Sequence, residues 1–271
     1  MDRRLFISGI ASGALVEHLS ASADERQAMP GSFEALLSRI QADSEMVEAG
    51  WKYREPSVSR GVGHGEPSKR KLSQAAIDLI VSCEIASPAV YERKYRRPIW
   101  PKGASGVTIG VGYDLRYANA RYINRDWPML STADRAALLK VATLSGQAAK
   151  AALPQVHDVD IPWPAANSQF LAFLPYPTKQ TEGAFPNCNA LSDDSFGALV
   201  SLIYNRGPAI VRNSKSRLEM YEIKQLMAAK KFKSVPDRIR SMKRLWTTPD
   251  SRGLVLRREA EAALFERGLH A

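Results

Sequence analysis

One carboxyl side chain stands out as a candidate proton donor. Glu84 closes the segment 72–84, whose apolar residues recur at helical spacing, and it falls four residues after Ile80 on the same side of that helix. Partial burial and the negative end of the helix dipole both disfavour a carboxylate there, so we expect a raised pKa. A carboxyl that stays neutral at working pH can act as a general acid. The alternative is a Glu that bends outward to meet one of the arginines that follow, Arg93, Arg96 and Arg97.

A hydroxyl and a second carboxyl lie in the segment 107–114, where apolar residues alternate strictly with small or polar ones. In a straight strand Thr108 and Asp114 would stand about 20 Å apart. The glycines at 110 and 112 permit a tight turn, so we predict a β-hairpin that folds these two residues side by side. The glycine-bearing face would also let a bulky ligand approach the backbone. The alternative is a purely structural hairpin in which Asp114 caps a following helix, and the pattern does not separate the two.

The amino-acid composition excludes several classes of protein and favours certain classes of partner. The chain has 271 residues, of which 45% are hydrophobic and 24% charged, which excludes a wholly disordered chain, a collagen and a coiled-coil rod. Its net charge of +10 favours a polyanionic partner such as nucleic acid, anionic lipid or an anionic cell wall. No apolar run is long enough to span a bilayer. The four histidines are scattered, so we expect neither a metal site nor a cofactor.

Three segments follow from the pattern along the chain. Residues 1–23 carry paired arginines, a short apolar stretch and Ala21-Ser22-Ala23, which together predict a twin-arginine-like export signal; an amphipathic helix is the alternative. Residues 24–71 are predicted to form a helix around Phe33 to Ile40 and then a flexible linker rich in Gly, Ser and Pro. Residues 72–271 are predicted to form one domain.

Cys83 and Cys188 could pair in an oxidising compartment or stay separate and buried.

The predicted domain is mostly helical. The apolar periodicity places helices at about 72–84, 131–153, 192–206, 216–231, 234–245 and 255–267, with the β element at 105–115. Six prolines between 154 and 186 predict an irregular segment over 154–190. The fold class is therefore α+β, with a small β-hairpin or sheet near the start of the domain.

Four blocks in order and rough spacing carry a family resemblance. They are Glu84, SGVTIGVGYDL at 105–115, SFGALVSLIYNRG at 195–207 and GLVLRREAEAALFERG at 253–268. Over about 72–268 the chain resembles the phage-type lysozymes, and most of all their pesticin-type branch of bacteriocin muramidases. Ordinary phage lysozymes carry an Asp between the Glu and the Thr, whereas residues 85–107 contain none. The pesticin-type arrangement places the acidic partner after the Thr instead.

The resemblance implies a lysozyme-like fold and an active site made of Glu84, Thr108 and Asp114. Glu84 would be the general acid and Asp114 the general base for a water that Thr108 helps to hold. Such a reaction inverts the anomeric centre, with the carboxyl groups roughly 6.5–9.5 Å apart. By family position, the residues expected to contact the sugar are Tyr113, Ser195, Asn205 and Arg206. Arg206 could equally stabilise its helix end. We interpret Arg257 and Arg258, near Glu261, as structural.

The expected function is that of a muramidase, which cleaves the β-1,4 bond between N-acetylmuramic acid and N-acetylglucosamine in peptidoglycan. A wall-binding protein without turnover and a lytic transglycosylase are the alternatives. A nucleic-acid-binding module ranks last, because no motif for it occurs. The resemblance implies peptidoglycan as the partner and is compatible with an immunity or inhibitor protein. We expect a monomer with no nucleic-acid partner and no stable membrane insertion. The signal pattern predicts a periplasmic or secreted protein.

Overall fold

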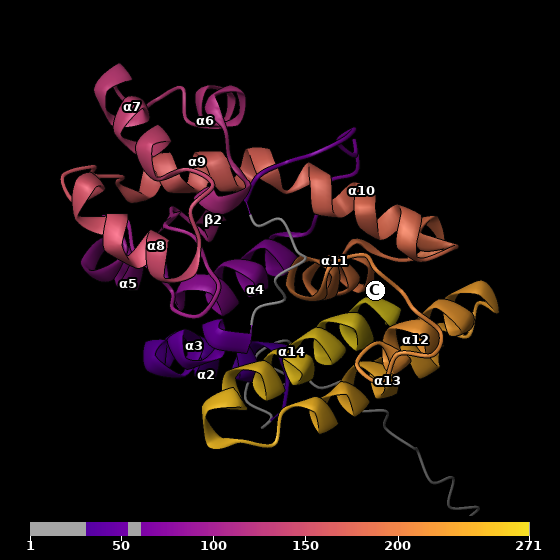
Figure 1. The fold of residues 1–271 in the computed structure, drawn as a ribbon. Coiled ribbons are helices and arrows are strands. Elements are labelled where there is room, and N and C mark those ends of the chain that lie inside the picture. Colours follow the sequence, from indigo (N-terminus) through magenta and orange to yellow (C-terminus); the bar gives the residue numbers. More distant parts are fainter. Residues whose placement is uncertain (1–30, 54–60, 271) are drawn as a thin grey trace, which may run out of the picture.

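The computed structural model describes residues 31–53 and 61–270. Within them the chain is mostly helical with one small antiparallel sheet, which is compatible with the α+β class predicted from the sequence (Figure 1). The helices and strands, in chain order, are α2 (Phe33–Ala42), α3 (Ser44–Gly50), α4 (Gln74–Ile85), α5 (Pro88–Lys94), β1 (Thr108–Ile109), β2 (Tyr113–Asp114), α6 (Ala120–Asp126), α7 (Thr132–Val141), α8 (Gly146–Ala152), α9 (Trp163–Phe173), α10 (Pro175–Ala184), α11 (Asp193–Arg206), α12 (Leu218–Ala228), α13 (Val235–Ser241) and α14 (Arg252–Leu269).

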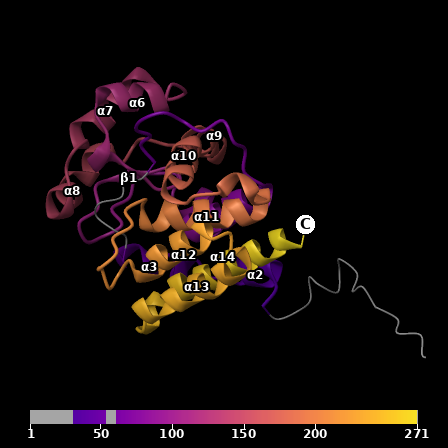
Figure 2. The same ribbon diagram turned by 90° about the vertical axis from the view of Figure 1, so that its right-hand side faces the viewer.

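Helix α11 forms the centre of the molecule. The Ser192 side chain caps its N-terminus, two aspartates in the first turn suit the helix dipole, and Gly207 ends it with a φ of 75°. Every side chain from Ser195 to Arg206 is buried. Helix α11 packs against α4, α10 and α14, so the hydrophobic core is built around it. In Figure 2, α12, α13 and α14 lie on one side of α11, and α6, α7 and α8 lie toward the other end of the molecule.

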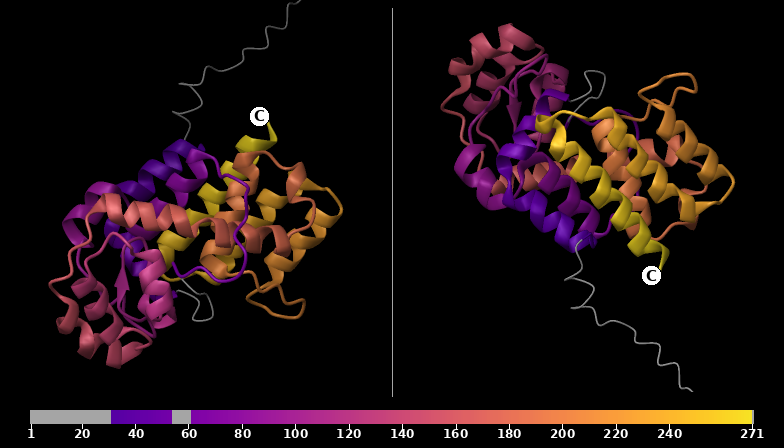
Figure 3. Two further views of the ribbon diagram at one scale, coloured as in Figure 1. Left: turned by 90° about the horizontal axis from the view of Figure 1, so that it is seen from above. Right: turned by 90° about the horizontal axis from the view of Figure 1, so that it is seen from below.

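The N-terminal helices belong to the same core. Helices α2 and α3 pack against α4 and α14, with Phe33, Leu36 and Ile40 buried in the contact (Figure 3). Residues 61–71, which fall in the segment predicted as a linker, also lie against the rest of the chain. Ser68 N–H donates to the Pro175 carbonyl at 2.9 Å, and the Arg70 guanidinium donates to the Cys188 carbonyl at 2.8 Å. The predicted boundary at residue 72 therefore does not coincide with a break in the packing.

The expectation of an irregular segment over 154–190 was wrong. Helices α9 and α10 occupy much of it, and each carries a proline in its first turn. Proline fits there because the N–H groups of the first turn have no intrahelical acceptor, so the N–H that proline lacks is not needed. The helix predicted over 131–153 is divided into α7 and α8, and Thr143 lies between them with a φ of 66°.

The sequence also led to expectations about an export signal and about membrane-spanning segments. The export signal proposed for residues 1–23 lies outside the described residues. Over 31–53 and 61–270, no helix combines the length and the apolar character needed to cross a membrane.

Close packing of α11 on α4 gives the first testable prediction. A Cβ added at Gly197 would stand 2.3 Å from the Ala76 Cβ, so Gly197→Ala should force the two helices apart and lower the free energy of unfolding by about 1–3 kcal/mol. Gly183 in α10 is the matched control, because a Cβ there meets nothing within 4 Å. Gly183→Ala should raise stability by up to about 1 kcal/mol through helix propensity. Urea unfolding of both variants measures the difference, and equal shifts would contradict the packing argument.

Candidate active site

Glu84 lies in the last turn of α4. Ser73 caps the start of this helix, and Ala86 ends it with a φ of 63°. The Glu84 side chain is only 2% exposed and points into the molecule. The alternative of an outward-turned Glu that meets Arg93, Arg96 or Arg97 therefore does not hold.

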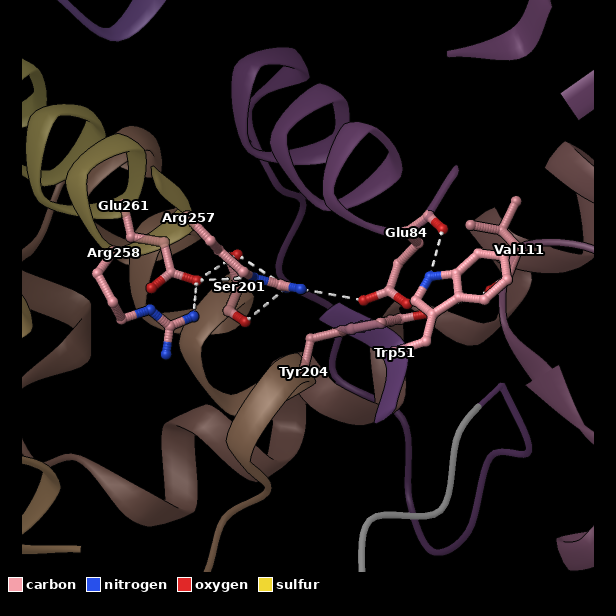
Figure 4. Close-up of polar contacts among 8 residues, drawn as sticks. All are labelled: Trp51, Glu84, Val111, Ser201, Tyr204, Arg257, Arg258 and Glu261. Carbon is pink, nitrogen blue, oxygen red and sulfur yellow. Dashed lines mark hydrogen bonds and ion pairs between the residues drawn. The ribbon is translucent and has the colours of Figure 1, made fainter. Parts of the chain in front are cut away.

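A buried ion pair holds this carboxyl. Arg257 of α14 donates from one terminal nitrogen to Glu84 Oε1 at 3.0 Å, and both side chains are almost completely buried (Figure 4). Sequence spacing had pointed to an apolar environment that would keep Glu84 neutral. The guanidinium supplies an opposing influence, because a neighbouring cation stabilises the carboxylate form. The partner comes 173 residues later in the chain, too far for sequence periodicity to reveal.

Arg257 is in turn held by α11 and by its own helix. It donates to the Ser201 carbonyl at 3.1 Å and to Glu261 Oε1 at 3.1 Å. Glu261 Oε1 also accepts from the Ser201 hydroxyl and from Arg258, both at 2.7 Å. Burial lowers the pKa of Arg257, but the surrounding Cys83, Glu84 and Glu261 raise it more, so it lies above its usual range. The sequence analysis interpreted Arg257 and Arg258 as structural partners of Glu261. The structure adds Glu84 to the partners of Arg257.

Arg258 has the opposite balance. Burial, only partly offset by Glu261 and reinforced by the Arg257 and Arg206 cations, lowers its pKa to about 10. Its Nε and one terminal nitrogen are buried without a hydrogen-bond partner among the described residues, and so is Glu261 Oε2. Figure 4 shows the resulting order from left to right: Glu261 and Arg258, then Ser201 and Arg257, then Glu84.

The predicted hairpin is confirmed. Strands β1 and β2 pair antiparallel with Thr108 opposite Asp114, and the turn between them uses Gly110 and Gly112 at φ values of 56° and 77°. Directly opposed residues project from the same face, with Cβ atoms about 5 Å apart. The fold therefore places Thr108 and Asp114 side by side in the hairpin, as the sequence indicated.

The Asp114 carboxylate is tightly bonded within the hairpin. Its Oδ1 accepts from the backbone N–H of Gly106 at 3.1 Å and of Arg116 at 2.9 Å, and Oδ2 pairs with the Arg116 guanidinium at 3.2 Å. A Cβ on Gly106 would stand 2.4 Å from Oδ1, which explains the glycine. The bond to Arg116 N–H also caps the short 3-10 helix Leu115–Tyr117. This capping role is the structural alternative that the sequence left open.

Glu84 meets the hairpin at a small cavity. Glu84, Thr108, Gly110 and Gly112 line about 10 Å³ of space, and Asp114 is not among the lining residues. A Cβ added to Gly112 would lie 3.5 Å from Glu84 Oε2, so this oxygen faces the turn while Oε1 faces Arg257. The Thr108 hydroxyl donates to the Gly106 carbonyl at 3.3 Å.

Three of the four residues predicted to contact the sugar have other roles. The Tyr113 ring is fully buried against Trp127, and its hydroxyl donates to Asp126 at 3.0 Å. Ser195 is fully buried and donates to the Phe265 carbonyl at 2.7 Å. Arg206 donates to the Ser216 carbonyl at 2.6 Å beside its helix end, which fits the alternative given for it. None of the three lines either of the two small cavities described here that adjoin Glu84.

Asn205 does lie near the catalytic candidate. It lines a second small cavity, of about 20 Å³, together with Glu84, Cys83 and Arg257. Cys83 and Cys188 are both free thiols in the structure, which is the second of the two alternatives that the sequence left open.

Trp51 is the main residue that sequence reasoning missed. Its indole N–H donates to the Glu84 carbonyl at 3.2 Å, on the side of Glu84 away from Arg257 (Figure 4). Trp51 lines both small cavities and a third, larger one. The available signal was the pair of aromatic residues Trp51 and Tyr53 in the N-terminal segment.

No family model matches this chain, and a search of curated proteins found no match either. Within 31–53 and 61–270, no group of three or more His, Cys, Asp or Glu residues could hold a metal ion.

The Glu84–Arg257 pair predicts a large stability effect. Arg257→Leu should lower the free energy of unfolding by about 3–5 kcal/mol, because it removes the paired cation from the buried Glu84 carboxyl and leaves Arg258 as the remaining cation of Glu261. Arg252→Leu on the same helix is the control: its pair with Asp43 is exposed and should be worth under about 1 kcal/mol. Guanidinium unfolding compares the two. Similar small losses for both would refute the buried-pair interpretation.

The cysteines give a second prediction for this region. Burial raises the pKa of Cys83 to about 12 and that of Cys188 to about 11, which leaves little thiolate at pH 8. Ellman's reagent should therefore react slowly with both thiols in the native chain and rapidly with two thiols after denaturation. Rapid native reaction, or fewer than two thiols after denaturation, would contradict these environments.

Proposed function

We propose that this protein is a peptidoglycan hydrolase, a muramidase that cleaves the β-1,4 bond between N-acetylmuramic acid and N-acetylglucosamine with inversion. The observation that carries the proposal is the cavity shared by Glu84 and Thr108, two residues singled out independently by their sequence patterns. This cavity shares Trp51, Tyr95 and Ile99 with a groove of about 510 Å³. A volume of that size lies within the range of ligand-binding pockets.

Glu84 is the general acid in this proposal. Because Oε1 accepts from Arg257, the transferable proton belongs on Oε2, the oxygen that faces the hairpin turn. Arg257 holds the carboxyl in one orientation and offsets the negative charge that Glu84 gains when its proton moves to the leaving oxygen.

Asp114 and Thr108 act on the attacking water. The cavity beside Thr108 has roughly the volume of one water molecule. The two backbone N–H groups that bind Asp114 Oδ1 hold its carboxyl group in a fixed orientation, as a general base requires. Thr108, on the same face of the hairpin, positions the water between Asp114 and the anomeric carbon. The inverting version requires the carboxyl groups to stand roughly 6.5–9.5 Å apart when substrate is bound.

Two other functions have support from single observations. The engagement of Asp114 by Gly106 and Arg116 favours a lytic transglycosylase, which needs only the acid Glu84 and leaves an anhydro-sugar. The deep burial of Glu84 favours a wall-binding protein without turnover. We also propose, on the sequence of residues 1–23, that the protein acts in the periplasm or outside the cell. We propose peptidoglycan as its partner and a monomer as its oligomeric state.

Sugar release from purified peptidoglycan tests the proposal. The wild-type chain should release fragments with ordinary reducing ends, detected by mass spectrometry. Glu84→Gln should lose at least about 100-fold in rate, because it removes the proton donor. Asp114→Asn should lose comparable activity, and Thr108→Ala less, because its hydroxyl only positions water. Glu66→Gln and Asp158→Asn, at exposed positions, are the matched controls and should keep wild-type rates.

Each contrary product has a distinct meaning. Products one water lighter, with activity retained in Asp114→Asn, would replace hydrolysis by lytic transglycosylation. Sedimentation with peptidoglycan but no release would leave the wall-binding function. An Asp114→Asn variant that loses stability in proportion to activity would assign Asp114 to the hairpin alone.

A further inference from the structure

A groove of about 510 Å³ lies beside the candidate active site. Helix α3 and the short 3-10 helix Trp51–Tyr53 form one wall, and the loop from Tyr95 to Lys102 forms the other. The first wall lies outside the part of the chain that resembles lysozymes, which begins at residue 72. The groove therefore contains a surface that neither the proposed chemistry nor the resemblance assigns.

Three aromatic rings dominate its lining. Trp51 and Tyr95 pack together with ring centroids 5.4 Å apart, and Trp100 is anchored by its indole N–H to the Ser105 carbonyl at 3.1 Å. Both tryptophans remain partly exposed. Rigid, partly exposed rings of this kind bind flat, weakly polar ligand faces at little entropic cost. The C–H face of a pyranose ring is such a surface.

The charges of the groove are balanced. Glu48 accepts from Lys94 at 2.8 Å and from the Tyr95 hydroxyl at 2.6 Å. Burial raises the pKa of Glu48, but these two bonds and the nearby Lys102 lower it more, so it stays charged. Lys52 pairs with Asp250 across the rim. A groove with compensated charges does not attract a phosphate backbone, although the whole chain is strongly basic, and this favours a neutral ligand over a nucleic acid.

Trp51 connects this groove to the proposed chemistry. The same side chain that lines the groove donates to the Glu84 carbonyl at 3.2 Å. We propose that the groove between α3 and the loop 95–102 binds the N-acetylated sugar units that flank the cleaved bond, with Trp51 and Trp100 as stacking platforms. The N-terminal segment 44–53 is then part of the substrate site. This inference rests on the proposed function for the identity of the glycan.

Binding of tetra-N-acetylchitotetraose tests the inference apart from turnover. The titration uses isothermal calorimetry on the full chain carrying Glu84→Gln, so that the sugar is not consumed. Adding Trp51→Ala or Trp100→Ala should weaken binding by at least about 10-fold, as expected for loss of one stacking platform. Trp100→Phe keeps a ring and should recover most of the affinity.

Trp163→Ala is the matched control, because Trp163 is also partly exposed but packs on Tyr91 away from the groove. It should bind the tetramer like the parent chain. Thermal unfolding of every variant separates lost binding from lost folding.

The outcomes distinguish the two proposals. Wild-type hydrolysis together with unchanged tetramer binding in folded Trp51→Ala and Trp100→Ala overturns the groove and leaves the muramidase. Tryptophan-dependent binding without any hydrolysis by the wild type overturns the muramidase and leaves the groove. No binding of the tetramer by the parent chain, or binding of a single-stranded oligonucleotide in its place, overturns the groove as a sugar site.

Discussion

The ion pair between Glu84 and Arg257 is the constraint on which the rest of the site depends. It joins α4 near the start of the domain to α14 at its end, across the central helix α11. Removing two charges from water costs several kcal/mol per ion unless further hydrogen bonds compensate. Ser201 and Glu261 supply those bonds to Arg257. The three helices must therefore pack in one register, and the orientation of the Glu84 carboxyl follows from that register.

The hairpin meets this fixed carboxyl through its glycines. Gly112 lies where a side chain would contact Glu84 Oε2, and Gly110 lies where a Cβ would stand 2.6 Å from the Trp127 ring. Tyr204 of α11 adds a hydroxyl that donates to the Val111 carbonyl at the turn. The turn is thus held between a buried ring and the central helix, which limits how far Thr108 can move relative to Glu84.

Sequence reasoning succeeded where the signal was local. The alternation over 107–114 and the two glycines predicted the hairpin and the pairing of Thr108 with Asp114. The register of a hairpin is determined by the hydrophobic pattern and the turn residues, which are close together in the sequence. It failed where the partner was distant or the cue ambiguous. Nothing near Glu84 points to Arg257, and prolines that open α9 and α10 look the same in sequence as prolines that prevent helices. For Tyr113 and Ser195 the family position carried no information on packing, and both side chains are fully buried in the structure.

A proton donor is neutral before the reaction, so a buried arginine beside it needs a second carboxylate to balance its charge. In this structure Glu261 is that carboxylate. Four buried groups, Glu84, Arg257, Glu261 and Arg258, carry two charges of each sign when Glu84 is ionised. When Glu84 takes up a proton, Arg257 and Arg258 share the one remaining carboxylate, Glu261, so each buried cation keeps a carboxylate contact although the four groups then carry one net positive charge. The second carboxylate therefore lowers the cost of neutralising the first. In the proposed reaction Glu261 would let a proton arrive at and leave Glu84 while the helices that hold it stay packed.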